Sequence, residues 1–207
     1  MMVIVALPLL LLPYRFSQKL EHFWSWIMEG LLKHVVGITH RVHGPRPDHA
    51  VIFASKHQSA WETIFLYGEL GSPAPVPKRE LIFIPVIGLF FIKVPSVPID
   101  RSAGRSSLKN LVNAANKINA IGDSILIYPQ GTRVAPGASH PYHSGTYAIY
   151  KATGYSGVFW PRRSMMKTPG VIDVQLLPEI PAGLDRQTFM KRLEHDIETA
   201  TDRLPKS

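Results

Sequence analysis

The sequence predicts an α/β fold: a mixed, largely parallel sheet flanked by helices. Short apolar segments at 51–54, 124–128 and 171–177 have the composition of strands, and segments with helical spacing of apolar residues separate them. The segment 124–128 (SILIY) is apolar without interruption, which is typical of a strand buried on both faces. Strands that alternate with helices favour a parallel sheet, whose functional sites lie at the carboxyl ends of the strands.

Composition narrows the class of protein further. The 207 residues fit one domain with an appendage, and the absence of cysteine excludes disulfides, cysteine-ligated metals and thiol nucleophiles. The net charge of +8 indicates an anionic partner. Among such partners, a mean hydropathy of +0.04 favours a lipid surface. We expect an N-terminal membrane-associated helical segment over 1–36 and the main domain over 37–207.

The first 36 residues motivate that division. Residues 1–14 carry no charged side chain and as a helix would be about 21 Å long, too short for a hydrocarbon core of about 30 Å. Pro8 and Pro13 interrupt them, which favours a shallow or re-entrant anchor. Residues 20–36 have helical spacing, and Trp24 and Trp26 suit a membrane interface. The alternative for residues 1–14 and for residues 20–36 is a segment that packs on the protein's own core.

Further helices are expected at 60–70, 102–121 and 144–152. Gly37 and Gly122 are expected to end the helices that precede them, and 94–99 should be extended because two prolines interrupt it. The segment 71–77 is predicted to be a loop or an edge strand. A last helix carries one apolar stripe, formed by Phe189, Leu193, Ile197, Ala200 and Leu204.

A histidine and an acid follow the first predicted strand. His57 comes directly after it, and Glu62 lies five residues further on. An imidazole is the usual general base near neutral pH, and a carboxylate can hold it in one tautomer. Five residues of regular helix place two side chains about 140° apart, so the pair requires Glu62 in the first turn and His57 before it. The structural alternative is a capping box from Ser59 to Glu62, with His57 an ordinary loop residue.

Two arginines also lie at predicted strand ends. Arg101 follows the extended segment 94–99, and its planar guanidinium suits a phosphate; a surface pair with Asp100 is the alternative. The segment 128–133 (YPQGTR) follows the strand 124–128 and ends in Arg133. Taken alone, it is equally an ordinary turn with a solvated arginine. One histidine and two arginines at strand ends together favour a functional site.

These segments resemble the ordered motif blocks of the 1-acyl-glycerol-3-phosphate acyltransferase family. The first block is a histidine, four residues and an acid, here His57 to Glu62. The second is similar to residues 76–81 (VPKREL), followed by 99–101 (IDR), and the third to residues 128–133. The resemblance covers roughly residues 1–204 and implies an acyltransferase domain over 37–207.

The resemblance implies transfer of a fatty acyl group from acyl-CoA or acyl carrier protein to the free hydroxyl of lysophosphatidic acid, giving phosphatidic acid. It implies His57 as the base and Glu62 as the carboxylate that orients it. The residues that it implies for substrate binding are Lys78, Arg101, Gly131, Thr132 and Arg133. It implies no metal and no cofactor beyond the acyl donor. The expected partners are membrane lipid rather than nucleic acid, at the cytoplasmic face of a bacterial inner membrane.

Three features depart from the family pattern. Glu62 stands where aspartate is commoner, and Gln130 stands where the family has glutamate. The fourth block should be an apolar strand after the helix that ends near Gly154, and we expect that this strand is deleted near 154–158. An inactive, membrane-bound relic that binds anionic lipid is therefore one alternative. An acyltransferase with another acceptor and a nucleic-acid-binding module are the others.

Close pairs of histidines also raise the question of a metal. His40 and His43 form one pair, and His140 and His143 form the other. Neither pair has a convincing set of carboxylate partners in the sequence, so we expect no metal site.

Overall fold

The computed structural model describes residues 23, 25–58, 61–84, 88, 91, 93–100, 104–135, 137–160 and 170–203. Its strands are β1 (Ile38–His43), β2 (Ile52–Ser55), β3 (Ala74–Pro75), β4 (Ile125–Ile127), β5 (Gly157–Trp160) and β6 (Gly170–Gln175). Its α-helices are α3 (Trp61–Glu69), α5 (Gly104–Ala120), α6 (Gly145–Thr153) and α7 (Arg186–Arg203). A π-helical turn, η2 (Leu32–Val36), and a 3-10 helix, η3 (Arg79–Phe83), complete the elements.

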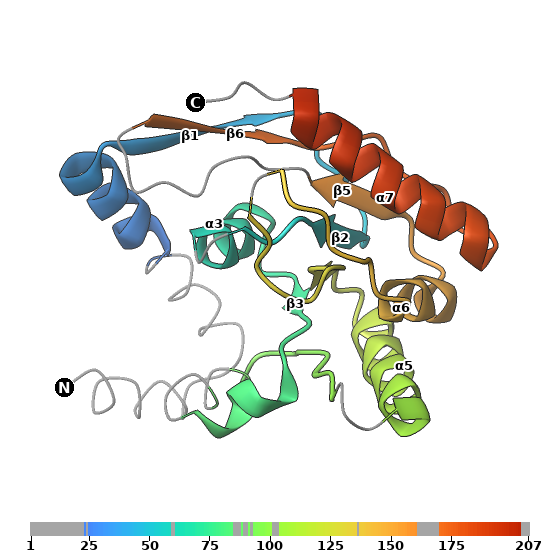
Figure 1. The fold of residues 1–207 in the computed structure, drawn as a ribbon. Coiled ribbons are helices and arrows are strands. Elements are labelled where there is room, and N and C mark those ends of the chain that lie inside the picture. The colour runs from blue at the N-terminus through green and yellow to red at the C-terminus, as the bar shows by residue number, and fades with distance from the viewer. Residues whose placement is uncertain are drawn as a thin grey trace.

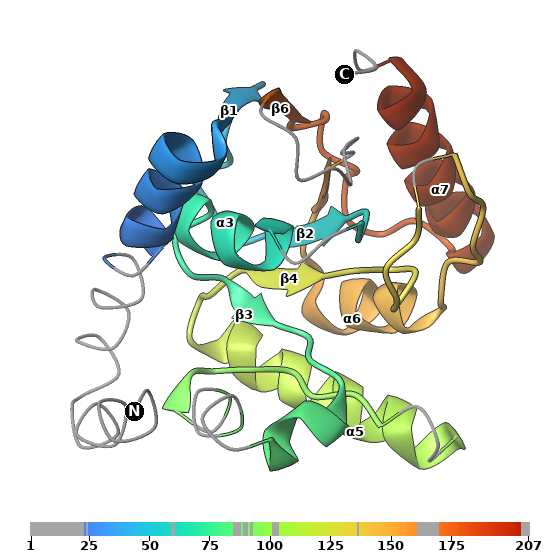
Figure 2. The same cartoon turned by 60° about the vertical axis from the view of Figure 1, so that its left-hand side comes forward.

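Four strands form the central sheet in the order β3-β4-β2-β5, and every pairing is parallel. Figure 2 shows β3, β4 and β2 running side by side with their carboxyl ends on the same edge. A separate two-stranded sheet pairs β1 with β6, also in parallel, and Figure 1 shows these two strands together although they come from opposite parts of the chain. The predicted α/β class with a largely parallel sheet is confirmed.

Apolar side chains cover both faces of the central sheet, which explains the uninterrupted apolar strands. Ile52 and Ile125 pack against α5, α6 and α7, whereas Phe53 and Leu126 face α3 and β6. Successive strand residues point to opposite faces, so each strand contributes to two cores. The carboxyl edge of this sheet is thereby fixed from two sides.

The helical predictions hold with local differences. The predicted helix 102–121 corresponds to α5, in which Leu111 and Ala115 are fully buried but Leu108 is 45% exposed. In α7, Phe189, Leu193 and Ile197 are all 0% exposed. Leu204, the last residue of the predicted stripe, lies outside the described residues.

The expected deletion of a strand near 154–158 is wrong. Helix α6 ends at Gly154, whose φ of 68° is the left-handed conformation that closes helices, and β5 starts only three residues later. β5 pairs with β2 along its whole length, from Gly157 beside Ile52 to Trp160 beside Ser55. The segment that looked too short for a connection and a strand contains both, because four residues suffice to pair with β2.

The structure also contains a strand that the sequence did not predict. β1 carries polar side chains at Thr39, His40, Arg41 and His43, and none of its residues is buried. Arg41 and His43 both contact Asp173 of β6, at 3.1 and 3.0 Å, which joins the two strands at their surface.

The part of the N-terminal segment that is described is helical from residue 25 to 31 and continues into η2, which ends at Gly37 as expected. Its apolar side chains are exposed: Trp26 by 69% and Val35 by 76%. None of the described helices combines the length and the hydrophobicity that crossing a bilayer needs. The predicted anchor at 1–14 lies outside the described residues.

Candidate active site

His57 and Glu62 are in direct contact at the carboxyl end of β2. His57 lies in the loop after the strand, and Glu62 lies in the first turn of α3. This is the arrangement that the five-residue spacing required. The His57 Nδ1 and Glu62 Oε1 atoms are 2.7 Å apart. A carboxylate only accepts hydrogen bonds, so Nδ1 carries the proton and Nε2 is left as the basic nitrogen.

The carboxylate of Glu62 is fully buried and shares one oxygen between two donors. The backbone N–H of Gln58 also donates to Oε1, at 2.7 Å. Glu62 therefore fixes the loop backbone as well as the imidazole. The capping alternative required Ser59, which lies outside the described residues.

Tyr128 supports His57 from the next strand. It follows β4 directly, and its ring stacks on the imidazole with 4.4 Å between centroids and 26° between planes. Its hydroxyl donates to the Glu62 carbonyl oxygen at 3.3 Å. Tyr128 was part of the third motif segment, but nothing in the local sequence indicated that its ring would contact His57.

The third segment lies against the His57 loop. Gly131 has a φ of 66° and its N–H donates to the Tyr128 carbonyl, so the chain reverses at a residue without a side chain. The N–H of Val134 then donates to the His57 carbonyl at 2.8 Å. Thr132 and Arg133, between these two bonds, are both exposed. The structure therefore brings Gly131, Thr132 and Arg133 to the same edge as His57.

Lys78 lies two positions beyond Val76, whose N–H donates to Leu126 of β4. Its backbone bridges to Ile99, and its side chain is exposed, 3.8 Å from Glu80. Lys78, Arg133 and His57 thus follow three adjacent parallel strands, β3, β4 and β2. Arg101 lies outside the described residues; its neighbour Asp100 pairs with Arg79 at 2.7 Å.

Two buried glutamines accompany the site. Gln58 is 2% and Gln130 is 1% exposed, and the side-chain amide atoms of both have no hydrogen-bond partner within the described ranges. Gln130 occupies the position at which the family pattern has glutamate. An ionised carboxylate would be costly in such a place, whereas a neutral amide is tolerated more easily.

The paired histidines have other partners. The ring of His40 packs 4.2 Å from that of Phe65, and burial lowers the pKa of His40. The hydrogen bond from His43 lowers the pKa of Asp173. The described residues contain no cluster of three potential metal-ligating side chains.

One network near His57 was not predicted at all. Lys56, the residue before His57, is buried and its ammonium lies 2.5 Å from Glu198 of α7. Tyr142 donates to the other oxygen of Glu198 at 2.8 Å. Glu198 lies 142 residues from Lys56, so no local pattern could have connected them.

Fold and site together define an α/β protein with a histidine held by a carboxylate at the carboxyl edge of a parallel sheet. Comparison with known proteins identifies the family to which such a protein belongs. A family model described as Acyltransferase matches residues 34–161, more than half of the chain. The chain belongs to this acyltransferase family.

Individual relatives agree. The chain is 31% identical over 183 residues to a 1-acyl-sn-glycerol-3-phosphate acyltransferase of Pseudomonas aeruginosa, covering 83% of this chain and 71% of that protein. It is 26% identical over 205 residues to a protein of the same name from Limnanthes alba, with 91% and 72% covered. A crystal structure of the 1-acyl-sn-glycerophosphate acyltransferase PlsC from Thermotoga maritima superimposes with a TM-score of 0.74, over 94% of this chain and 82% of that one, at 17% identity. That match shows that the fold is shared.

Proposed function

We propose that this protein transfers a fatty acyl group from a thioester to the free hydroxyl of 1-acyl-glycerol-3-phosphate, giving phosphatidic acid. The observation that carries the proposal is the 2.7 Å contact between His57 Nδ1 and Glu62 Oε1 at the carboxyl end of β2. Membership of the acyltransferase family supports the reaction, and the similarity to 1-acyl-sn-glycerol-3-phosphate acyltransferases supports the substrate class.

The chemistry follows from this geometry. Nε2 of His57 removes the proton of the acceptor hydroxyl as its oxygen attacks the thioester carbonyl. The imidazolium is stabilised by Glu62, which is already placed to accept from Nδ1. The carbon–sulfur bond then breaks, and the thiolate takes the proton back from His57. A thioester is activated in advance, so this sequence requires no metal and no covalent enzyme intermediate.

The cationic side chains at the neighbouring strand ends suit the acceptor's phosphate. Lys78 and Arg133 are both exposed and follow β3 and β4. Arg101 is the third cation that we assign to this role. Binding the phosphate here, with Gly131 and Thr132 in the adjoining turn, would orient the hydroxyl toward His57.

The donor is proposed to be acyl-CoA or acyl carrier protein, acting as a co-substrate with no further cofactor. We also propose that the protein acts at a membrane, on the cytoplasmic face of a bacterial inner membrane. The support for membrane binding, though not for the face, is the exposed apolar surface of the N-terminal helical part, formed by Phe23, Trp26, Ile27, Leu31 and Val35. The presence of β5 removes the observation that motivated an inactive relic.

The decisive experiment is thiol release from acyl-CoA and acyl carrier protein donors, with lysophosphatidic acid, with monoacylglycerol and with no acceptor. We expect release that depends on the phosphorylated acceptor, and we expect His57→Ala to abolish it without unfolding the chain. His195→Ala changes an exposed histidine on α7 and is the matched control, for which unchanged turnover is expected. A folded His57→Ala variant that turns over at the wild-type rate would disprove this mechanism.

A further inference from the structure

The buried lysine beside His57 has a single ionic partner in the described residues. The Lys56 side chain is only 1% exposed, and its Nζ donates to Glu198 Oε2 at 2.5 Å. A buried ammonium is costly unless a counter-charge meets it. Lys56 is also aimed at α7 rather than at solvent, so its Nζ is not placed to bind a substrate.

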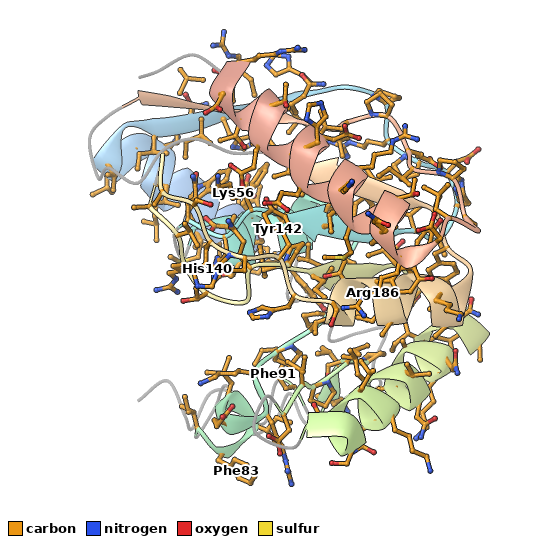
Figure 3. The ribbon with its side chains drawn as sticks, turned by 45° about the vertical axis from the view of Figure 1, so that its right-hand side comes forward. Lys56, Phe83, Phe91, His140, Tyr142 and Arg186 are labelled. Carbon is orange, nitrogen blue, oxygen red and sulfur yellow. The ribbon has the colours of Figure 1, made fainter. Side chains whose placement is uncertain are left out.

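The second carboxylate oxygen of Glu198 accepts a hydrogen bond from the loop that follows β4. Tyr142 donates its hydroxyl to Glu198 Oε1 at 2.8 Å, and burial, together with the charge of Glu198, raises the pKa of Tyr142 so that it stays a donor. The next residue, His143, donates its N–H to the Pro129 carbonyl of the third motif segment at 2.9 Å. Figure 3 shows Lys56 and Tyr142 lying beside each other next to α7.

Glu198 is itself held firmly. Its neighbour Ile197 is fully buried, as is Leu193 one turn earlier, so the helix cannot shift without exposing core. Helix α7 also lies beyond residues 34–161, which match the acyltransferase family model. A carboxylate outside the matched segment therefore joins two loops of the site inside it.

We propose that Lys56, Glu198 and Tyr142 are positioning residues. Their two hydrogen bonds to Glu198, here called the clamp, connect α7 to the His57 loop and hold the imidazole of His57 within proton-transfer distance of the acceptor hydroxyl. The proposal rests on the proposed function, in which His57 is the base. Displacing a catalytic group by about 1 Å can reduce a rate about a hundredfold, so a part-buried contact at the residue next to His57 is placed to affect turnover.

The first test is kinetic and uses Glu198→Gln, which keeps the side-chain shape and removes the charge. We expect kcat to fall about tenfold or more, with KM for the acceptor and the donor unchanged, because displacement of the base affects chemistry rather than binding. Asp196→Asn is the control: it removes an acid from the same helix, where Asp196 forms a surface ion pair with Arg192. Its kcat should stay within about twofold, as exposed pairs contribute little.

A second variant tests whether any loss of activity in Glu198→Gln comes only from misfolding caused by the unpaired charge of Lys56. Lys56→Met/Glu198→Gln leaves no unpaired buried charge, so we expect it to fold and still to show the lowered kcat, with a loss no larger than that of one single variant. A double variant that regains wild-type kcat, or a Glu198→Gln variant that keeps it, would overturn the proposal.

Hydrogen exchange separates this proposal from the proposed function. The amides of Gln58 and Val134 report on the loop, since they bond to Glu62 and to the His57 carbonyl. In the double variant we expect both to exchange faster than in wild type, with amides of β2 and β4 unchanged. Unchanged exchange at Gln58 and Val134 would refute the clamp. If His57→Ala were as active as wild type, the proposed function would fail, but these exchange rates would still decide whether α7 holds the loop.

Discussion

The contact between His57 and Glu62 depends on where α3 begins. Trp61 is its first residue, which places Glu62 in the first turn, where a negative side chain is favoured by the helix dipole. Two N–H donors, one from the imidazole and one from the backbone of Gln58, compensate the burial of this carboxylate. One side chain thus sets the tautomer of His57 and the shape of the loop that carries it.

Glu62→Gln separates these two roles. An amide oxygen can still accept from Gln58, but it cannot stabilise an imidazolium with a full charge. We expect kcat to fall about a hundredfold or more while KM changes little, by analogy with neutralised triad carboxylates. Stopped-flow measurement of thiol release, with melting temperature recorded in parallel, checks this. A kcat within a few-fold of wild type would mean that Glu62 acts only on loop structure.

At the scale of elements, α7 has more influence on the site than its place late in the chain suggests. Its 18 residues pack Phe189, Leu193 and Ile197 into the core shared with α5 and α6. Its outer face is polar, with the exposed pair Arg192–Asp196 at 3.4 Å. The helix is therefore anchored by this row of three buried apolar side chains, and their packing determines where Glu198 lies.

Leu193→Ala tests this anchoring. Leu193 is 0% exposed, and truncating a buried leucine costs about 2–5 kcal/mol of unfolding free energy, a large share of the roughly 5–15 kcal/mol of a typical domain. Urea denaturation followed by circular dichroism gives the value. The control Lys191→Ala, on the exposed side of the same helix, should stay within about 0.5 kcal/mol. Equal losses in the two variants would show that the stripe does not anchor α7.

At the scale of the whole molecule, net charge and exposed apolar surface act on the same kind of partner. The chain has a net charge of +8, and the N-terminal helical part exposes Phe23, Trp26 and Val35 by 54%, 69% and 76%. Long-range attraction to an anionic bilayer and insertion of apolar side chains are additive contributions to binding.

Vesicle binding measures both contributions. We expect sedimentation with vesicles containing phosphatidylglycerol, weakened at about 0.5 M salt because charges are then screened over a few ångströms. Trp26→Ser/Val35→Ser should bind about tenfold more weakly, since it removes apolar area that would leave water. Leu108→Ser/Ile121→Ser, which alters two exposed apolar residues at α5, is the control expected to bind normally. Equal weakening in both double variants would argue against a specific membrane face.

Prediction from sequence succeeded where the determining contacts are local. β2 and β4 are buried on both faces and so have continuous apolar sequences, and His57 and Glu62 lie within one loop and one helical turn. β1 was missed because a half-exposed strand with polar side chains has no such pattern. The sequence predicted no strand at β5 because the segment after Gly154 is short. Its pairing with β2, which only the fold reveals, makes it a strand. The role of Glu198 depends on a contact across 142 residues, which only the fold creates.

The pairing of β1 with β6 has a consequence for biosynthesis. Arg41 and Asp173, partners in that ladder, are 132 residues apart, so at about 5–20 residues per second β1 is synthesised roughly 7 to 26 s before its partner. A bare apolar strand would invite aggregation during such a wait. The threonine, arginine and histidines of β1 make it a polar strand, and we therefore expect it to stay hydrated until β6 has been synthesised.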